Sequence, residues 1–255
     1  MAEEDILAPD TAEIDSYKET DVFAWANNMV QYKDELKIDL YLISKTFVLY
    51  RTTLAKELGK ALEPLFIDNV LEYILDGAER GLIVRGFEDA EDEEGVLQRT
   101  QVFKVDKARE VLNFLKTQSA EIETFKEEHD FKRMKGILAR VTHPELKQDV
   151  FLIKALPQSN IMSGRTGWMM REGKFIPFDA DAAVRIPMDN QLLVIDQDIY
   201  VFSQTRLKQL FGYNAKEASI AEKKVAAIIA NFRLTFPEDV TMQHMVAGKK
   251  SINRE

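Results

Sequence analysis

The residues of this 255-residue chain that could do chemistry are mainly carboxylates, and the most suggestive group joins Asp149 to Glu172 and Lys174. Restriction-type nucleases place a carboxylate and a Glu-x-Lys unit on adjacent strands, where two carboxylates hold a divalent metal and the lysine assists the attacking water. The competing interpretation of Arg-Glu-Gly-Lys is a tight β-turn in which Gly173 supplies the positive φ. We favour the turn and keep the metal-dependent nuclease as an alternative.

Two Asp-x-Asp pairs, Asp179/Asp181 and Asp196/Asp198, could also ligate a cation or act as paired acids. Asp is equally favoured between strands, where its side chain bonds to the backbone, so we interpret both pairs as turns. The three histidines are too far apart in sequence for a local metal motif, and the absence of cysteine excludes thiolate sites and disulfides. The sequence therefore predicts no catalytic residue, no metal and no cofactor.

Charge is spread unevenly along the chain, whose formal net charge is −9. Residues 1–20 carry seven acidic residues and one lysine, whereas residues 131–174 carry nine basic and three acidic ones. A positive excess inside an acidic protein is typical of a surface that contacts phosphates, although a solvated sheet face would have the same composition. The candidate DNA-binding residues are Lys132, Arg133, Lys135, Arg165, Arg171 and Lys174.

Apolar spacing indicates the elements that must position these residues. A period near four predicts helices, and a period near two predicts strands. Asp106 is predicted to be the N-cap of the helix that ends near residue 117. Helices are predicted over 20–30, 55–81, 106–117 and 118–131, and strands over 37–44, 46–52 and 101–105.

The pattern then alternates for about 70 residues, with turn-forming residues between short apolar segments. Short connections favour antiparallel neighbours, so we predict an antiparallel β-meander of five to seven strands. C-terminal helices follow, with Ser203 as the cap and Gly212 as the end of the first, and a second over 215–232. The fold class predicted is α+β, in two parts: 1–118 with an acidic loop at 87–95, and 119–255.

Apolar runs are too short to span a membrane, and the N-terminal segment is acidic where an export signal would be basic and apolar. We therefore expect a cytoplasmic protein.

The order of elements resembles the KwaB family, the B components of the Kiwa anti-phage defence system, and the uncharacterised-domain family that contains them. The resemblance runs from KIDLYLISK through GILARV and DVFLIKALP, and residues 190–213 (NQLLVIDQDIYVFSQTRLKQLFGY) are its most specific part. It implies a non-enzymatic antiviral defence protein that forms a homodimer or higher homo-oligomer and binds double-stranded DNA. It also implies docking on a KwaA-like integral-membrane partner, at the inner face of the membrane. The net charge of −9 departs from what a DNA-binding protein leads one to expect.

Two other functions remain open. A pure protein-interaction subunit would use the apolar helices at 61–76 and 219–232 together with the acidic segments. An acidic chain could also mimic DNA, although its charges are clustered instead of regularly spaced.

Overall fold

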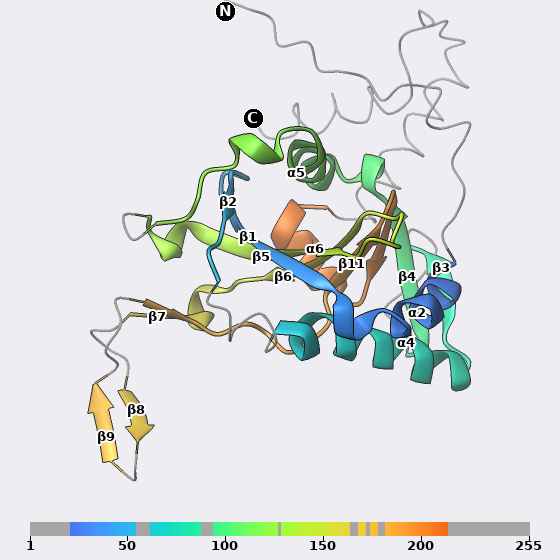
Figure 1. The fold of residues 1–255 in the computed structure, drawn as a ribbon, viewed down its shortest axis with the longest axis horizontal. Helices are drawn as coiled ribbons and strands as arrows, with labels where there is room; N and C mark the ends of the chain where they lie inside the picture. Colours follow the sequence, from blue (N-terminus) through green and yellow to red (C-terminus); the bar gives the residue numbers. More distant parts are fainter. Residues whose placement is uncertain are drawn as a thin grey trace, which may run out of the picture.

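An eight-stranded sheet forms the centre of this computed structural model (Figure 1). The structure describes residues 21–54, 62–87, 94–126, 129–163, 168–171, 174–177 and 182–213. The strands of the sheet are β1 (Lys37–Ser44), β2 (Leu49–Arg51), β3 (Ile83–Gly86), β4 (Val96–Gln101), β5 (Met134–Thr142), β6 (Val150–Ala155), β11 (Leu192–Ile195) and β12 (Asp198–Val201).

The strand order is β2-β1-β5-β6-β11-β12-β4-β3, and every neighbouring pair is antiparallel except β3 and β4. The longest pairing joins β1 to β5, from Lys37 opposite Thr142 to Ser44 opposite Met134. Strands from both sides of residue 118 therefore share one sheet, since β1 pairs with β5 and β12 pairs with β4. The predicted α+β class is confirmed.

Helices cover both faces of the sheet. One face packs against α2 (Val22–Val30), the π-helical turn η2 (Pro64–Asp68) and α4 (Asn69–Glu79), and the other against α5 (Asp106–Thr117) and α6 (Gln204–Phe211). In Figure 1, α2 and α4 lie below the sheet and α5 lies above it. Alternation along β1 explains both layers, because Leu40 and Leu42 join the first core and Tyr41 and Ile43 join the second. No helix in the described part of the chain is long and apolar enough to cross a membrane.

Residues between β6 and β11 leave the sheet as an arm. In it, β7 (Ile161–Ser163) pairs with β10 (Ala182–Val184), and β8 (Trp168–Arg171) pairs with β9 (Lys174–Pro177). Figure 1 shows the β8–β9 hairpin projecting away from the body. We call the described residues between 158 and 190 the arm.

The arm corrects the predicted strand order of the meander. The chain does not pass from β6 to a neighbouring strand at 168–171, because β6 pairs with β5 on one side and β11 on the other. A nested hairpin satisfies backbone hydrogen bonds as well as a meander does, and both show the same period of two. The alternation therefore identified strands but did not determine their partners.

The helix predicted over 118–131 is wrong. The chain forms a 3-10 turn at Ser119–Glu121, then runs extended so that Thr124 bridges Arg51 of β2. Arg51 also donates from Nη2 to the carbonyl of Ser119 at 2.8 Å. These contacts cover the β2 edge of the sheet, which a helix here would leave open.

One further prediction needs adjustment, and others lie where the structure does not test them. The strand predicted over 101–105 lies earlier, at 96–101, because pairing with β12 ends at Gln101 and a 3-10 turn follows. The helix predicted over 215–232, residues 1–20 and most of the acidic loop at 87–95 lie outside the described residues.

Gly212 ends α6 as predicted, in the left-handed region with φ of 69°. A Cβ built there meets no atom within 4 Å, so the need for glycine comes from the backbone alone. Gly212→Ala should lower the free energy of unfolding by about 1 kcal/mol, because alanine is strained at positive φ. Gly212→Asn should lower it less, because asparagine tolerates this region. Chemical denaturation measures both, and equal losses would show that the strain is not the cause.

Candidate nucleic-acid interface

The predicted DNA-binding residues occupy two places in the fold. Lys132 and Arg133 form a 3-10 turn before β5, and Lys135 is the second residue of that strand. Arg171 and Lys174 stand directly opposite each other in the β8–β9 hairpin of the arm. Arg165 lies outside the described residues.

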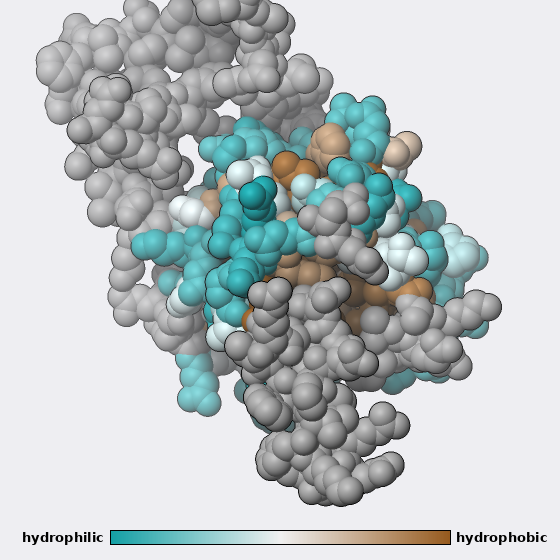
Figure 2. Space-filling model, turned by 90° about the vertical axis from the view of Figure 1, so that its left-hand side faces the viewer, coloured by the Kyte–Doolittle hydropathy of each residue, from teal (hydrophilic) through white to brown (hydrophobic). Residues whose placement is uncertain are grey.

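The base of the arm is hydrogen bonded to the start of β5. Gln158 donates from Nε2 to the carbonyl of Lys132 at 2.9 Å, and the amide of Leu156 donates to the carbonyl of Lys135 at 2.7 Å. The arm that carries the second group of cations therefore leaves the sheet beside the first group. Figure 2 looks onto the side from which the arm projects, and its described surface is largely hydrophilic, with a hydrophobic strip between the hydrophilic areas.

The structure adds two lysines that the search for a basic stretch missed. Lys45 lies in the turn between β1 and β2, and its amide donates to the carbonyl of Arg133 at 2.8 Å. Lys107, in the first turn of α5, places its Nζ 5.5 Å from the centroid of the Phe47 ring. We call the set of Lys45, Lys107, Lys132, Arg133 and Lys135 the basic cluster.

Phe47 organises part of this cluster. The Nζ of Lys135 lies 3.1 Å from the centroid of the Phe47 ring, which is a close cation–π contact. The same ring stacks on Phe211 of α6, with centroids 6.5 Å apart. Phe47 has φ of 67°, a conformation that is costly for a residue with a bulky side chain. Its packing and the hydrogen bond from the Val48 amide to Ser44 Oγ, 2.9 Å long, offset that cost.

Most of the basic cluster lacks a carboxylate partner. Within the described ranges, no Asp or Glu lies within ion-pair distance of Lys45, Lys132, Arg133 or Lys135. Burial, and then the charge of Lys107, lower the pKa of Lys135 to about 8. A lysine whose pKa is lowered in this way gains more from a bound anion than a fully solvated one does.

Other bases of the 131–174 stretch are already committed to the fold. The carboxylate of Asp149 lies 3.1 Å from Lys116 of α5 and 3.5 Å from Arg140 of β5. Lys154 is only 2% exposed, although the sequence places it in the basic stretch. The usable positive surface is therefore smaller than the composition suggests, and it is concentrated at the basic cluster.

Lys154 fastens the return of the arm to the sheet. Its Nζ donates to the carbonyls of Pro187, Met188 and Asp189 at 3.0, 3.4 and 2.9 Å. It also lies 5.2 Å from the centroid of the Phe66 ring. Burial lowers the pKa of Lys154 to about 8, against the opposing effect of Asp189. The charge is satisfied by main-chain oxygens, so this lysine has a structural role.

The carboxylates proposed for nuclease chemistry are not brought together in the described residues. Asp149 precedes β6, whereas the arm that carries Lys174 leaves from the other end of that strand. Asp149 is held in its ion pairs, and Glu172 lies outside the described residues. No group of three or more His, Asp or Glu side chains that could hold a metal occurs in the part of the chain that the structure describes.

Asp196 lies in the tight turn between β11 and β12, and Asp198 is the first residue of β12. Asp196 has φ of 54°, and its Oδ1 accepts from the amide of Asp149 at 3.0 Å. Asp198 is fully buried, with its carboxylate 3.9 Å from Nε of Arg99. The turn interpretation is therefore confirmed for Asp196 but not for Asp198, which is a buried strand residue, while Asp179 and Asp181 lie outside the described residues.

Comparisons with protein-family models, with curated proteins and with solved structures gave no match.

The role of Lys154 predicts a particular dependence of stability on pH. The pKa of Lys154 is about 8 in the folded state and has the ordinary lysine value of 10.5 in the unfolded chain. Between these two values the unfolded state binds more protons, so the free energy of unfolding should rise with pH in the wild type. In Lys154→Met this rise should be shallower by up to about 1.4 kcal/mol per pH unit.

Urea denaturation at pH 8.5, 9 and 10 measures the difference in slope. Lys147→Met is the matched control, because Lys147 is exposed and makes no comparable contacts. Equal slopes for wild type and Lys154→Met would show that Lys154 is not the buried, charged anchor described above.

Proposed function

We propose that this protein binds double-stranded DNA through the sugar–phosphate backbone, without reading base sequence. The observation that carries the proposal is the basic cluster, in which four of five cations lack a carboxylate partner among the described residues. Lys and Arg that contact phosphates supply affinity and carry no sequence information. The sequence pattern and the resemblance to the KwaB family point to the same activity.

The geometry of the cluster favours phosphate contact over base contact. Its residues come from a turn, a 3-10 turn, the start of a strand and the first turn of a helix, so no single element presents them as a recognition helix does. Phe47 is the aromatic ring at its centre, but Lys135 lies on that ring and Phe211 stacks on it. The ring therefore organises cations and does not offer a free face for stacking a base.

The arm extends the proposed contact surface. Arg171 and Lys174 are register partners in the β8–β9 hairpin, which follows the β7 strand of the β7–β10 pairing. Ten extended residues span roughly 33 Å at most, which is about one turn of B-form DNA. A duplex that contacts the basic cluster could thus contact the hairpin at a separate set of phosphates.

The resemblance also supports a wider proposal, in which the chain is a self-associating anti-phage defence subunit that docks on an integral-membrane partner. Co-expression with the product of the neighbouring gene should lower phage plating relative to either gene alone. Equal plating in the three strains would count against this role and would leave DNA binding unaffected.

The DNA-binding proposal predicts a loss of affinity that depends on salt. The triple variant Lys132→Gln, Arg133→Gln and Lys135→Gln should bind a duplex more weakly than wild type at every sequence tested. Each lost phosphate contact should reduce the slope of log K against log salt by about 0.9, and the three together by about 2.7. Fluorescence anisotropy at several salt concentrations, with two unrelated duplexes, measures both effects.

The matched control removes the same charge elsewhere. Lys33, Lys37 and Arg80 are exposed and lie near Asp68, Asp39 and Asp76, respectively. The variant Lys33→Gln, Lys37→Gln and Arg80→Gln should keep the wild-type salt slope. A slope reduced equally in both variants, or no binding by the wild type, would refute the proposed interface.

A further inference from the structure

We infer that Lys107 and Lys135, held against the ring of Phe47, form a preorganised seat for a single phosphate group. The inference rests on the proposed function, because the phosphate to which it commits is a phosphodiester of the DNA backbone. Lys132 and Arg133 then act as more exposed contacts around this seat.

The first argument is that one ring gathers two ammonium groups. The Nζ atoms of Lys135 and Lys107 lie 3.1 and 5.5 Å from the Phe47 centroid. Like charges repel, so such an arrangement is costly unless something attracts both of them. The π face attracts both ammonium groups, but of the two lysines only Lys107 has a carboxylate partner, Glu110. An anion placed beside Lys135 would compensate its charge, which is why a phosphate fits.

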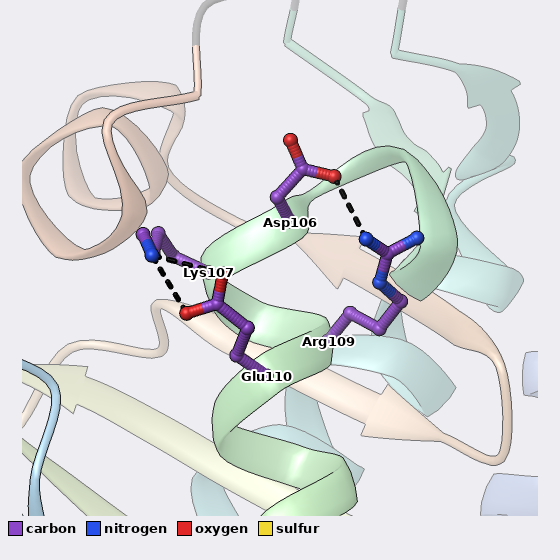
Figure 3. A network of polar contacts seen from close by, with 4 residues as sticks. All are labelled: Asp106, Lys107, Arg109 and Glu110. Atoms are coloured by element: carbon purple, nitrogen blue, oxygen red, sulfur yellow. Dashed lines mark hydrogen bonds and ion pairs between the residues drawn. The ribbon is translucent and has the colours of Figure 1, made fainter. Parts of the chain in front are cut away.

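The second argument is that the nearby acids are already engaged (Figure 3). Asp106 lies 3.3 Å from Nη2 of Arg109, and both carboxylate oxygens of Glu110 accept from Lys107, at 2.8 and 2.7 Å. These are i,i+3 pairs within α5, and neither acid is paired with Lys135. Lys135 is therefore the uncompensated charge of the pair.

The third argument comes from the other elements around Lys135, which add further cations. The β1–β2 turn contributes Lys45, and the 3-10 turn before β5 contributes Arg133. Carboxylates come from α5 and from Asp130, and they are engaged locally. Those of α5 pair within the helix, and Asp130 accepts from the amide of Lys132 at 2.8 Å. The electrostatic field at Lys135 thus favours an anion. Burial, and then the charge of Lys107, lower the pKa of this lysine.

A bound phosphate should raise the pKa of Lys135, which is lowered in the free protein. The pKa of Lys135 is about 8 in the free protein, and a contacting phosphate raises it. At pH 7 Lys135 is already protonated in the free protein. At pH 9 it is mostly neutral, so binding must be coupled to the uptake of a proton. Duplex affinity should therefore fall by up to about tenfold between pH 7 and pH 9.

The decisive variant is Lys135→Arg, because a guanidinium keeps its charge at pH 9 and can still lie on the Phe47 ring. Duplex affinity is measured by anisotropy titration at pH 7 and pH 9, at constant salt. It should fall between these pH values in wild type and change little or not at all in Lys135→Arg. Lys132→Arg is the matched control, and it should keep the wild-type loss. Equal pH dependence in wild type and Lys135→Arg would overturn the phosphate seat while DNA binding stands. Absence of binding by all of them would instead refute the proposed function.

A second measurement identifies the source of the phosphate. The lysine side chains can be labelled with ¹³C and titrated by NMR, with Lys135→Arg assigning the Lys135 signal. A pKa that rises with duplex but not with inorganic phosphate at equal ionic strength supports the inference. A rise with inorganic phosphate alone would assign the seat to a free anion, and a rise with neither would overturn it.

Discussion

Burial of β6 on both faces is the constraint on which the rest of the structure depends. All six residues from Val150 to Ala155 are buried, and the five apolar ones alternate between two hydrophobic cores. A strand of this kind needs a neighbour on each side and a layer above and below, because its backbone and both rows of side chains must be removed from water. The neighbours β5 and β11 and the two helical layers meet this requirement. Charged groups are therefore displaced to the ends of the strands, to turns and to helix surfaces.

Lys154 is the only charged residue of β6, and it explains how the arm between β6 and β11 is attached to the sheet. A buried ammonium needs hydrogen-bond acceptors, and the return of the arm supplies three main-chain carbonyls. Gln191 reinforces the same junction by accepting from the amide of Ala155 at 2.6 Å. The arm is thus tied to the sheet at its base, where β6 ends and β11 begins. In the described part of the arm, the β7–β10 pairing lies between the outer hairpin and the body.

The elements that could be predicted are those whose cause is local. The helix at Val22–Val30 follows an Asp21 cap, the strand at Lys37–Ser44 alternates, and Gly212 ends a helix because it adopts positive φ. What could not be predicted depends on contacts distant in sequence. Extended structure at Thr124 requires Arg51, and the burial of Lys154 requires a loop more than thirty residues later. The candidate site follows the same division. Lys132, Arg133 and Lys135 were found by composition, whereas Lys45 and Lys107 join them only because the fold brings three elements to Phe47.

The negative net charge of the chain does not oppose a phosphate-binding surface at the basic cluster. Electrostatic interaction between exposed charges is screened over about 8–10 Å at physiological salt, so the potential at a site is set by its close neighbours. At the cluster, the acids of α5 are engaged in ion pairs with Lys107 and Arg109. Farther along the same face, Asp149 is shared between Lys116 and Arg140. Acidic residues beyond this range affect the rate at which a polyanion associates more than the contacts it makes once bound. The relevant quantity is therefore the local balance around Lys135, which is positive, and not the sum over the chain.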